Sequence, residues 1–143
     1  MSQTKQFRAP SVISTGLGAA KEVGAHAKRL GKKALIVTDT NLVKIGLLTG
    51  IKESLDAAGV SYSVYDEVVM EPVADYVDEG LRTFRDAGAN IVVAVGGGSP
   101  IDTGKAIAAL SRNPGKIMFS GDFPDRARPS RSPYSTERGW AYR

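Results

Sequence analysis

Three consecutive glycines stand where an apolar run meets a segment with helix-start signals. The run Ile91–Val95 is followed directly by Gly96, Gly97 and Gly98, and then by Ser99. Glycine lets the backbone adopt positive φ and approach a ligand closely. A helix N-terminus at this point would present free N–H groups, which bind anions. The pattern predicts a cradle for a pyrophosphate, although a tight turn that needs glycine for geometry alone is the alternative interpretation.

The helix expected at Ser99–Leu110 carries three start signals. Ser99 suits the N-cap, because its hydroxyl can accept from a free backbone N–H. Pro100 suits the first helical position, where no N–H is needed. Asp102 can reach back to the cap and meets the positive end of the helix dipole. We therefore place Ser99 and Asp102 in the anion site with the glycines.

Two other phosphate-binding motifs are excluded by spacing. A P-loop requires Gly, four residues and then Gly-Lys-Ser/Thr. Here five residues separate Gly98 from Gly104, and Lys105 is followed by Ala106. The dinucleotide fingerprint G-x-G-x-x-G is also unmet, because Gly16–Lys21 matches only its first two glycines.

Short apolar runs alternate with segments of helical periodicity. The expected strands are Ser11–Thr15, Ala34–Thr38, Ser61–Tyr65 and Ile91–Val95, and the expected helices are Ala19–Leu30, Leu47–Ala58, Val73–Ala87 and Ser99–Leu110. Strands that are apolar on both faces belong in parallel sheets covered by helices on both sides. Repeated strand–helix order indicates the same architecture. We predict one α/β domain over residues 1–113, Rossmann-like and doubly wound, with a mainly parallel sheet.

Composition excludes several classes of protein. The net charge of +4 is concentrated in residues 114–143, which hold six Lys/Arg and three Asp/Glu against 13 and 12 in the rest. No basic stripe marks a nucleic-acid surface. Cysteine is absent, so disulfides and thiolate metal sites are excluded. No apolar run is long enough to span a membrane, and residues 1–6 lack an apolar signal core. We expect a cytoplasmic protein.

The last 30 residues differ in character from the preceding domain. Residues 114–143 are rich in Pro, Arg, Ser and Gly and show no hydrophobic period. Asp125–Arg138 offers little to bury, so we expect an irregular or disordered tail.

Several segments, in order, resemble the iron-containing alcohol dehydrogenase family. Val95–Thr103 (Val-Gly-Gly-Gly-Ser-Pro-Ile-Asp-Thr) looks like its signature, and Ala34–Asp39 resembles its first nucleotide-site strand. Pro10–Gly18 is similar to its opening strand and turn, and Glu71-Pro72 stands where the family often has Glu-Pro-Asn-Pro. The resemblance covers about residues 7–118.

The resemblance implies an oxidoreductase that transfers hydride between an alcohol or aldehyde and nicotinamide. Gly96–Gly98 and Ser99 would hold the cofactor pyrophosphate. Asp39 would accept from the adenosine ribose hydroxyls and favour NAD over NADP, because a carboxylate repels a 2′-phosphate. A helix cap or loop acid is the alternative interpretation of Asp39.

The sequence also departs from the family pattern. Gly104 stands where alanine is usual, which would weaken its helix by about 1 kcal/mol. Val73-Ala74 replaces the usual Asn-Pro, which puts one nicotinamide-side contact in doubt. The family binds iron or zinc through one Asp and three His of a second, helical domain, whereas His26 is the only histidine here.

We therefore assign no catalytic or metal-binding residue to this chain. We expect a truncated or frameshifted copy that holds the cofactor-binding half and is inactive alone. The alternatives are a nucleotide-binding module without catalysis, and a relative of the glycerol dehydrogenase or dehydroquinate synthase type. A surface made for the missing domain would favour association into an oligomer.

Overall fold

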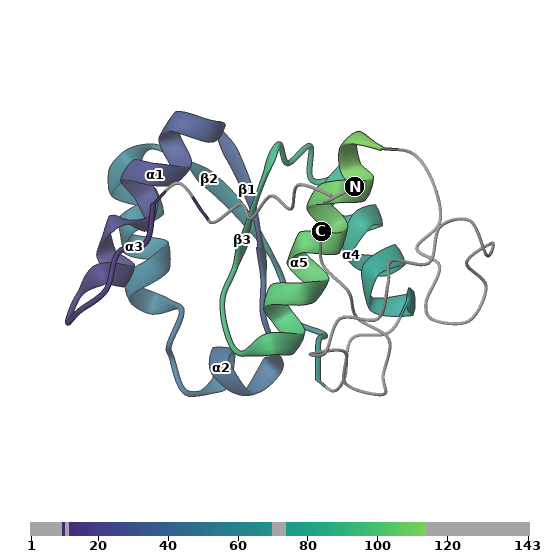
Figure 1. The fold of residues 1–143 in the computed structure, drawn as a ribbon, viewed down its shortest axis with the longest axis horizontal. Coiled ribbons are helices and arrows are strands. Elements are labelled where there is room, and N and C mark those ends of the chain that lie inside the picture. Colours follow the sequence, from purple (N-terminus) through teal and green to yellow (C-terminus); the bar gives the residue numbers. More distant parts are fainter. Residues whose placement is uncertain (1–9, 11, 70–73, 114–143) are drawn as a thin grey trace, which may run out of the picture.

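The computed structural model describes residues 10, 12–69 and 74–113, and its centre is a parallel sheet of three strands (Figure 1). The strands are β1 (Lys33–Val37), β2 (Ser61–Tyr65) and β3 (Ile91–Ala94), in the spatial order β2-β1-β3. Each expected strand of this sheet is found within one residue of its predicted bounds. The predicted α/β class with a parallel sheet is confirmed.

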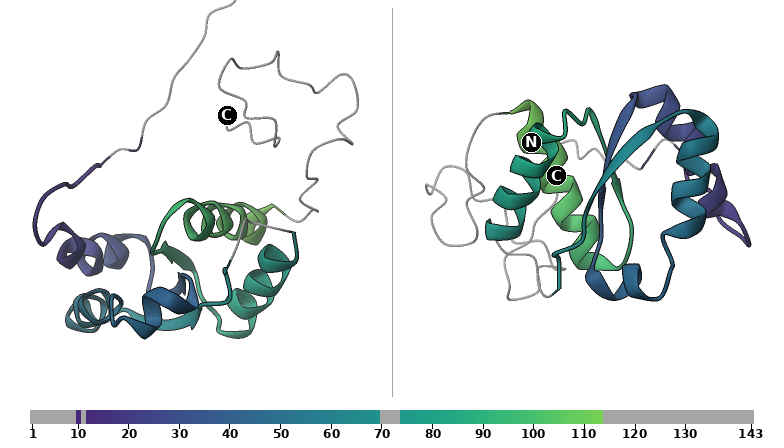
Figure 2. Two further views of the ribbon diagram at one scale, coloured as in Figure 1. Left: turned by 90° about the horizontal axis from the view of Figure 1, so that it is seen from below. Right: turned by 180° about the vertical axis from the view of Figure 1, so that it is seen from behind.

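Helices cover both faces of the sheet (Figures 1 and 2). The helical elements are a 3-10 turn η1 (Ala19–Glu22), α1 (Val23–Leu30), α2 (Thr40–Lys44), α3 (Thr49–Ala58), α4 (Ala74–Asp86) and α5 (Gly98–Arg112). Helices α1 and α3 pack together on one face, and α4 and α5 pack together on the other. None of the helices in the described part of the chain has the length and apolar composition needed to cross a bilayer.

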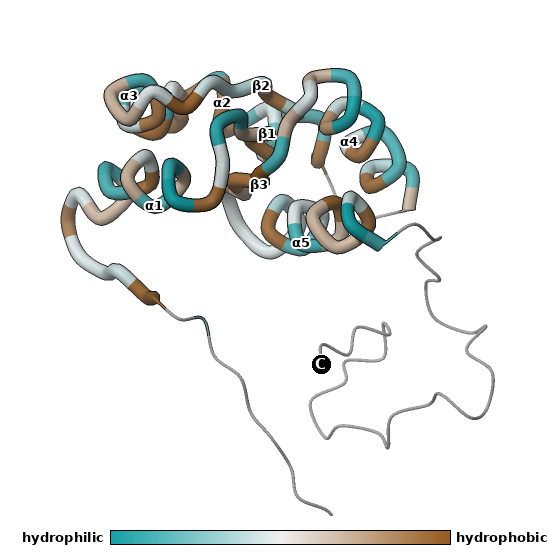
Figure 3. The backbone as a smooth tube through the Cα atoms, turned by 90° about the horizontal axis from the view of Figure 1, so that it is seen from above, coloured by the Kyte–Doolittle hydropathy of each residue, from teal (hydrophilic) through white to brown (hydrophobic). Residues whose placement is uncertain are grey.

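Burial of β1 on both faces explains why its residues from Ala34 to Val37 are all apolar and do not alternate with polar ones. Leu35 and Val37 point into the core shared with α4 and α5, whereas Ala34 and Ile36 point into the core shared with α1 and α3. All four side chains are fully buried. Figure 3 shows hydrophobic residues gathered at the strands between the two helical layers. A central parallel strand must be apolar on both faces for this reason.

The first 58 residues depart from the predicted elements in three places. No strand forms over residues 12–15, and Ser11 lies outside the described residues. Val12 and Ile13 are 59% and 71% exposed, so their apolar composition does not place them in the core. The helix expected at Ala19–Leu30 begins as a 3-10 turn, and the helix expected at Leu47–Ala58 begins at Thr49, after the unpredicted α2.

Helices α1 and α3 cross with their backbones nearly in contact. A Cβ atom placed on Gly24 of α1 would overlap the backbone carbonyl of Ser54 on α3. The Ser54 hydroxyl accepts from the Gly24 N–H at 2.9 Å and donates to the Lys21 carbonyl. This crossing therefore depends on glycine at position 24.

We predict that Gly24→Ala lowers the free energy of unfolding by about 1–3 kcal/mol, because the backbone at Ser54 has to move. The matched control is Gly50→Ala in α3, where a Cβ would meet nothing within 4 Å. That control should be neutral or stabilise the chain by up to about 1 kcal/mol. Urea unfolding of both variants measures the difference, and equal midpoints would contradict the close crossing.

Candidate functional site

A pocket of about 250 Å³ lies beyond the carboxyl ends of β1 and β3. It is lined by Asp39, Asn41, Val68, Val69, Gly97, Gly98, Ser99 and Pro100. The structure thus brings together four of the residues that the sequence singled out, although they come from two segments about 60 positions apart. Gly96 and Asp102 do not line it.

The three glycines have different roles. Gly96 has φ of 141°, and a Cβ there would lie 2.9 Å from Pro100 Cγ and 3.0 Å from Leu42 Cδ1. Gly96 is therefore required by the turn itself, as the purely geometric interpretation expects. Gly97 and Gly98 would carry a Cβ with nothing within 4 Å. Their bare backbone faces open space, where a ligand can approach.

The predicted N-cap is wrong. Helix α5 begins at Gly98 with Gly97 as its N-cap, so Ser99 and Pro100 are the second and third helical residues. Gly97 is extended and has no side chain that could cap the helix. The N–H groups of Gly98 and Ser99, in the first helical turn, have no partner within the helix, and both residues line the pocket.

Asp102 also lies elsewhere than predicted. Its carboxylate contacts Lys105 Nζ at 3.3 Å along α5, one turn further from the N-terminus. It does not reach back to the start of the helix, because the start is at Gly98 and the reciprocal cap with Ser99 is not formed. The interpretation of Asp102 as a residue of the anion site finds no support in this geometry.

Asp39 is the N-cap of α2, as the alternative interpretation expects. Its Oδ1 accepts from the N–H groups of Asn41 at 2.9 Å and Leu42 at 3.0 Å. The same residue lines the pocket. These two roles are compatible, because the cap uses one carboxylate oxygen and fixes the side chain, while Oδ2 makes neither cap bond.

Gly104 allows α5 to lie close to β3. A Cβ at this position would lie 2.9 Å from Ala94 Cβ and 3.4 Å from Val92 Cγ1. From the sequence, Gly104 predicted only a weaker helix. Its close contact with β3 could not be predicted, because it depends on how the helix packs against the strand. Close packing of helix on strand is also the purpose of the third glycine in dinucleotide-binding turns.

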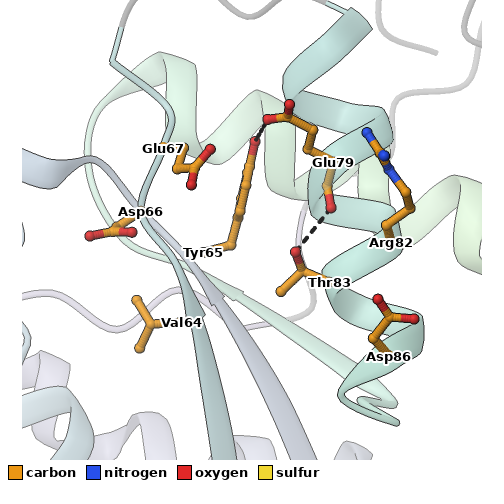
Figure 4. Close-up of a pocket in the computed structure, with 8 residues that line it drawn as sticks. All are labelled: Val64, Tyr65, Asp66, Glu67, Glu79, Arg82, Thr83 and Asp86. Carbon is orange, nitrogen blue, oxygen red and sulfur yellow. Dashed lines mark hydrogen bonds between the residues drawn. The ribbon is translucent and has the colours of Figure 1, made fainter.

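A second, more acidic pocket was not predicted from the sequence. It has a volume of about 400 Å³ and lies between the end of β2 and α4 (Figure 4). Its lining residues are Val64, Tyr65, Asp66, Glu67, Glu79, Arg82, Thr83 and Asp86. Val68 and Val69, which follow Glu67 directly, line the first pocket instead. The short segment 66–69 therefore contributes two residues to each pocket.

Tyr65 is the buried polar group of this second pocket. Its hydroxyl donates to Glu79 Oε2 at 3.3 Å. Burial, with the nearby carboxylates of Glu79 and Glu67, raises the pKa of Tyr65 well above its ordinary value. The phenol therefore stays protonated and acts as a structural donor rather than as a base.

The described residues do not fit a catalytic metal. Such sites need at least three protein ligands, and no suitable group of three His, Cys, Asp or Glu exists in residues 10, 12–69 and 74–113. His26 lies on α1, partly exposed, with Nε2 3.8 Å from Glu22 Oε2. Glu71-Pro72, Val73 and the predicted tail at 114–143 lie outside the described residues.

The chain belongs to the iron-containing alcohol dehydrogenase family, whose family model matches residues 10–134. That match extends past Met118, where the resemblance described in the sequence analysis ends. The chain is 46% identical to lactaldehyde reductase of Escherichia coli K12 over 100 residues, which are 69% of this chain and 26% of that protein. It is 38% identical to an NAD-dependent methanol dehydrogenase of Bacillus methanolicus over 112 residues, which are 78% and 29%.

Solved structures show the same fold. A 1,3-propanediol oxidoreductase superposes with a TM-score of 0.76 at 36% identity, over 80% of this chain and 30% of that one. An NADH-dependent butanol dehydrogenase of Thermotoga maritima gives 0.72 at 28% identity, over 80% and 29%. The chain therefore spans about a quarter to a third of the length of the relatives that it matches.

We predict that Asp39→Ala lowers the free energy of unfolding by about 1 kcal/mol, because α2 loses its cap. Asp39→Asn keeps an acceptor oxygen and should unfold within a few tenths of a kcal/mol of the parent chain. Denaturant unfolding of the parent chain and of the two variants measures their order of stability. Equal losses in both variants would show that charge rather than capping matters at this position.

Proposed function

We propose that residues 1–113 form the cofactor-binding part of an NAD-dependent alcohol dehydrogenase. The observation that carries the proposal is the convergence of Asp39, Gly97, Gly98 and Ser99 on one pocket at the mouth of a parallel sheet. Ligands of open α/β sheets bind at this edge. The family supports hydride transfer between an alcohol or aldehyde and nicotinamide as the reaction of a full-length protein.

The start of α5 would hold the pyrophosphate. Backbone N–H groups at Gly98 and Ser99 lie at the positive end of the helix dipole, which favours a negative charge. The open space beside Gly97 and Gly98 gives phosphate oxygens room to approach these donors. When NAD is bound, its nicotinamide accepts or donates the hydride.

Asp39 would bind the adenosine ribose with the carboxylate oxygen that the α2 cap does not use. The cap holds the side chain in one orientation, so little entropy is lost when a hydroxyl donates to it. A carboxylate next to the ribose disfavours a 2′-phosphate. We therefore propose NAD as the cofactor, with NADP bound more weakly.

No step through iron or zinc is assigned to this chain, because its described residues offer no ligand set. The contribution of these residues is to bind the cofactor and to fix its adenosine half at the sheet edge. We propose an alcohol or aldehyde as the substrate of a full-length protein, and we assign no substrate contact to the described residues.

Titration calorimetry with NAD tests this function. The parent chain should bind at micromolar to millimolar NAD, and Gly97→Val should bind at least about tenfold more weakly, because the side chain fills the phosphate space and costs charged hydrogen bonds. Because Gly97 is the N-cap of α5 and valine is a poor N-cap, the melting temperature should also fall by about 4–8 °C, so the titration is run well below the melting temperature of the variant.

The matched control is again Gly50→Ala, which adds a Cβ in open space and lines neither pocket. Its affinity for NAD should equal that of the parent chain. No heat from the parent chain at millimolar NAD would refute the proposed function.

A further inference from the structure

Asp39 is paired through the backbone with a second acidic residue, Glu67. An isolated antiparallel bridge joins the two residues just beyond the ends of β1 and β2. The Thr40 hydroxyl donates to the Asp66 carbonyl at 2.8 Å in the same place. The segment that carries Glu67 is therefore fixed against the segment that carries Asp39.

This pairing brings the backbones of two acidic residues together. Residues paired in an antiparallel bridge have Cβ atoms about 4.5–5.5 Å apart, and like charges in such a pair destabilise the fold. Asp66 adds a third carboxylate on the same short segment. Asp39 caps α2, but the further negative charges of Glu67 and Asp66 beside it are unfavourable for the fold, and they would act on an anion bound nearby.

We propose that Glu67 is a second specificity residue of the cofactor site, whose negative charge disfavours the 2′-phosphate of NADP alongside Asp39. This inference rests on the proposed function. Glu67 lines the acidic pocket and not the cofactor pocket, so it acts through its electric field and not by contact (Figure 4).

Coulomb's law sets the size of the effect. Two like charges about 8 Å apart near a protein surface change a binding constant by about threefold to tenfold, and a phosphate carries more than one charge. Such an interaction is screened over about 8 Å at physiological salt but over about 30 Å at 0.01 M. The contribution of Glu67 must therefore depend on ionic strength, whereas a hydrogen bond or a packing contact would depend on it little.

The test is calorimetric titration of the full chain with NAD and with NADP, at 0.01 M and 0.5 M salt. Glu67→Gln keeps the shape of the side chain and removes its charge. At low salt we expect it to tighten NADP binding about threefold to tenfold while NAD binding changes less than twofold. At high salt the gain should fall below about twofold.

The matched control is Glu53→Gln, which removes the same charge from an exposed position on α3 that lines neither pocket. Its ratio of NADP to NAD affinity should stay within twofold of the parent value.

The outcomes separate this inference from the proposed function. If the parent chain binds NAD but Glu67→Gln leaves the affinity ratio unchanged, the inference is wrong and the proposed function stands. Equal losses for both cofactors would make Glu67 a structural residue and also overturn the inference. If the parent chain binds neither cofactor, both proposals fail together.

Discussion

The proposed cofactor binding depends on one interaction, the attraction between an anion and the backbone N–H groups that open α5. A helix start can serve this purpose only if its first turn is reachable and no side chain occupies the ligand's place. Both conditions are met at Gly97 and Gly98, where an added Cβ would meet nothing within 4 Å. Gly96 provides the turn with its positive φ, and Gly104 lets the same helix lie close to β3.

Asp39 is the acidic residue that lines the pocket. Asp39 is held by the α2 cap, and its backbone is paired with Glu67 across the ends of β1 and β2. The pocket therefore combines the backbone donors of Gly98 and Ser99 with the carboxylate of Asp39. An adenosine diphosphate with a free ribose fits such a distribution, because its phosphates need donors and its hydroxyls need acceptors.

The sequence predicted the sheet well and the starts of helices less well. β1 and β3 are short apolar runs, and an apolar run bounded by glycine or polar residues is a strong signal for a buried strand. α2 has only five residues, too few for a helical period, and Asp39 was the one available signal of its start. Ser99 was misplaced because a glycine N-cap leaves no mark in the sequence that distinguishes it from a loop.

Contacts between distant segments were beyond prediction. The pairing of Asp39 with Glu67, the acidic pocket beside α4, and the fit of Gly24 against Ser54 each join residues from separate elements. Their positions follow from how helices and strands pack, which periodicity does not encode. The convergence of Asp39 on the glycine loop was foreseen, because parallel strands place their carboxyl ends at one edge.

Amide chemical shifts recorded during a titration with NAD test the central claim most directly. The account predicts saturable shifts centred on the amides of Gly97, Gly98 and Ser99, with smaller ones at Asp39 and Asn41. Saturable shifts confined to the acidic pocket around Tyr65 and Glu79, or none at the start of α5, would contradict it.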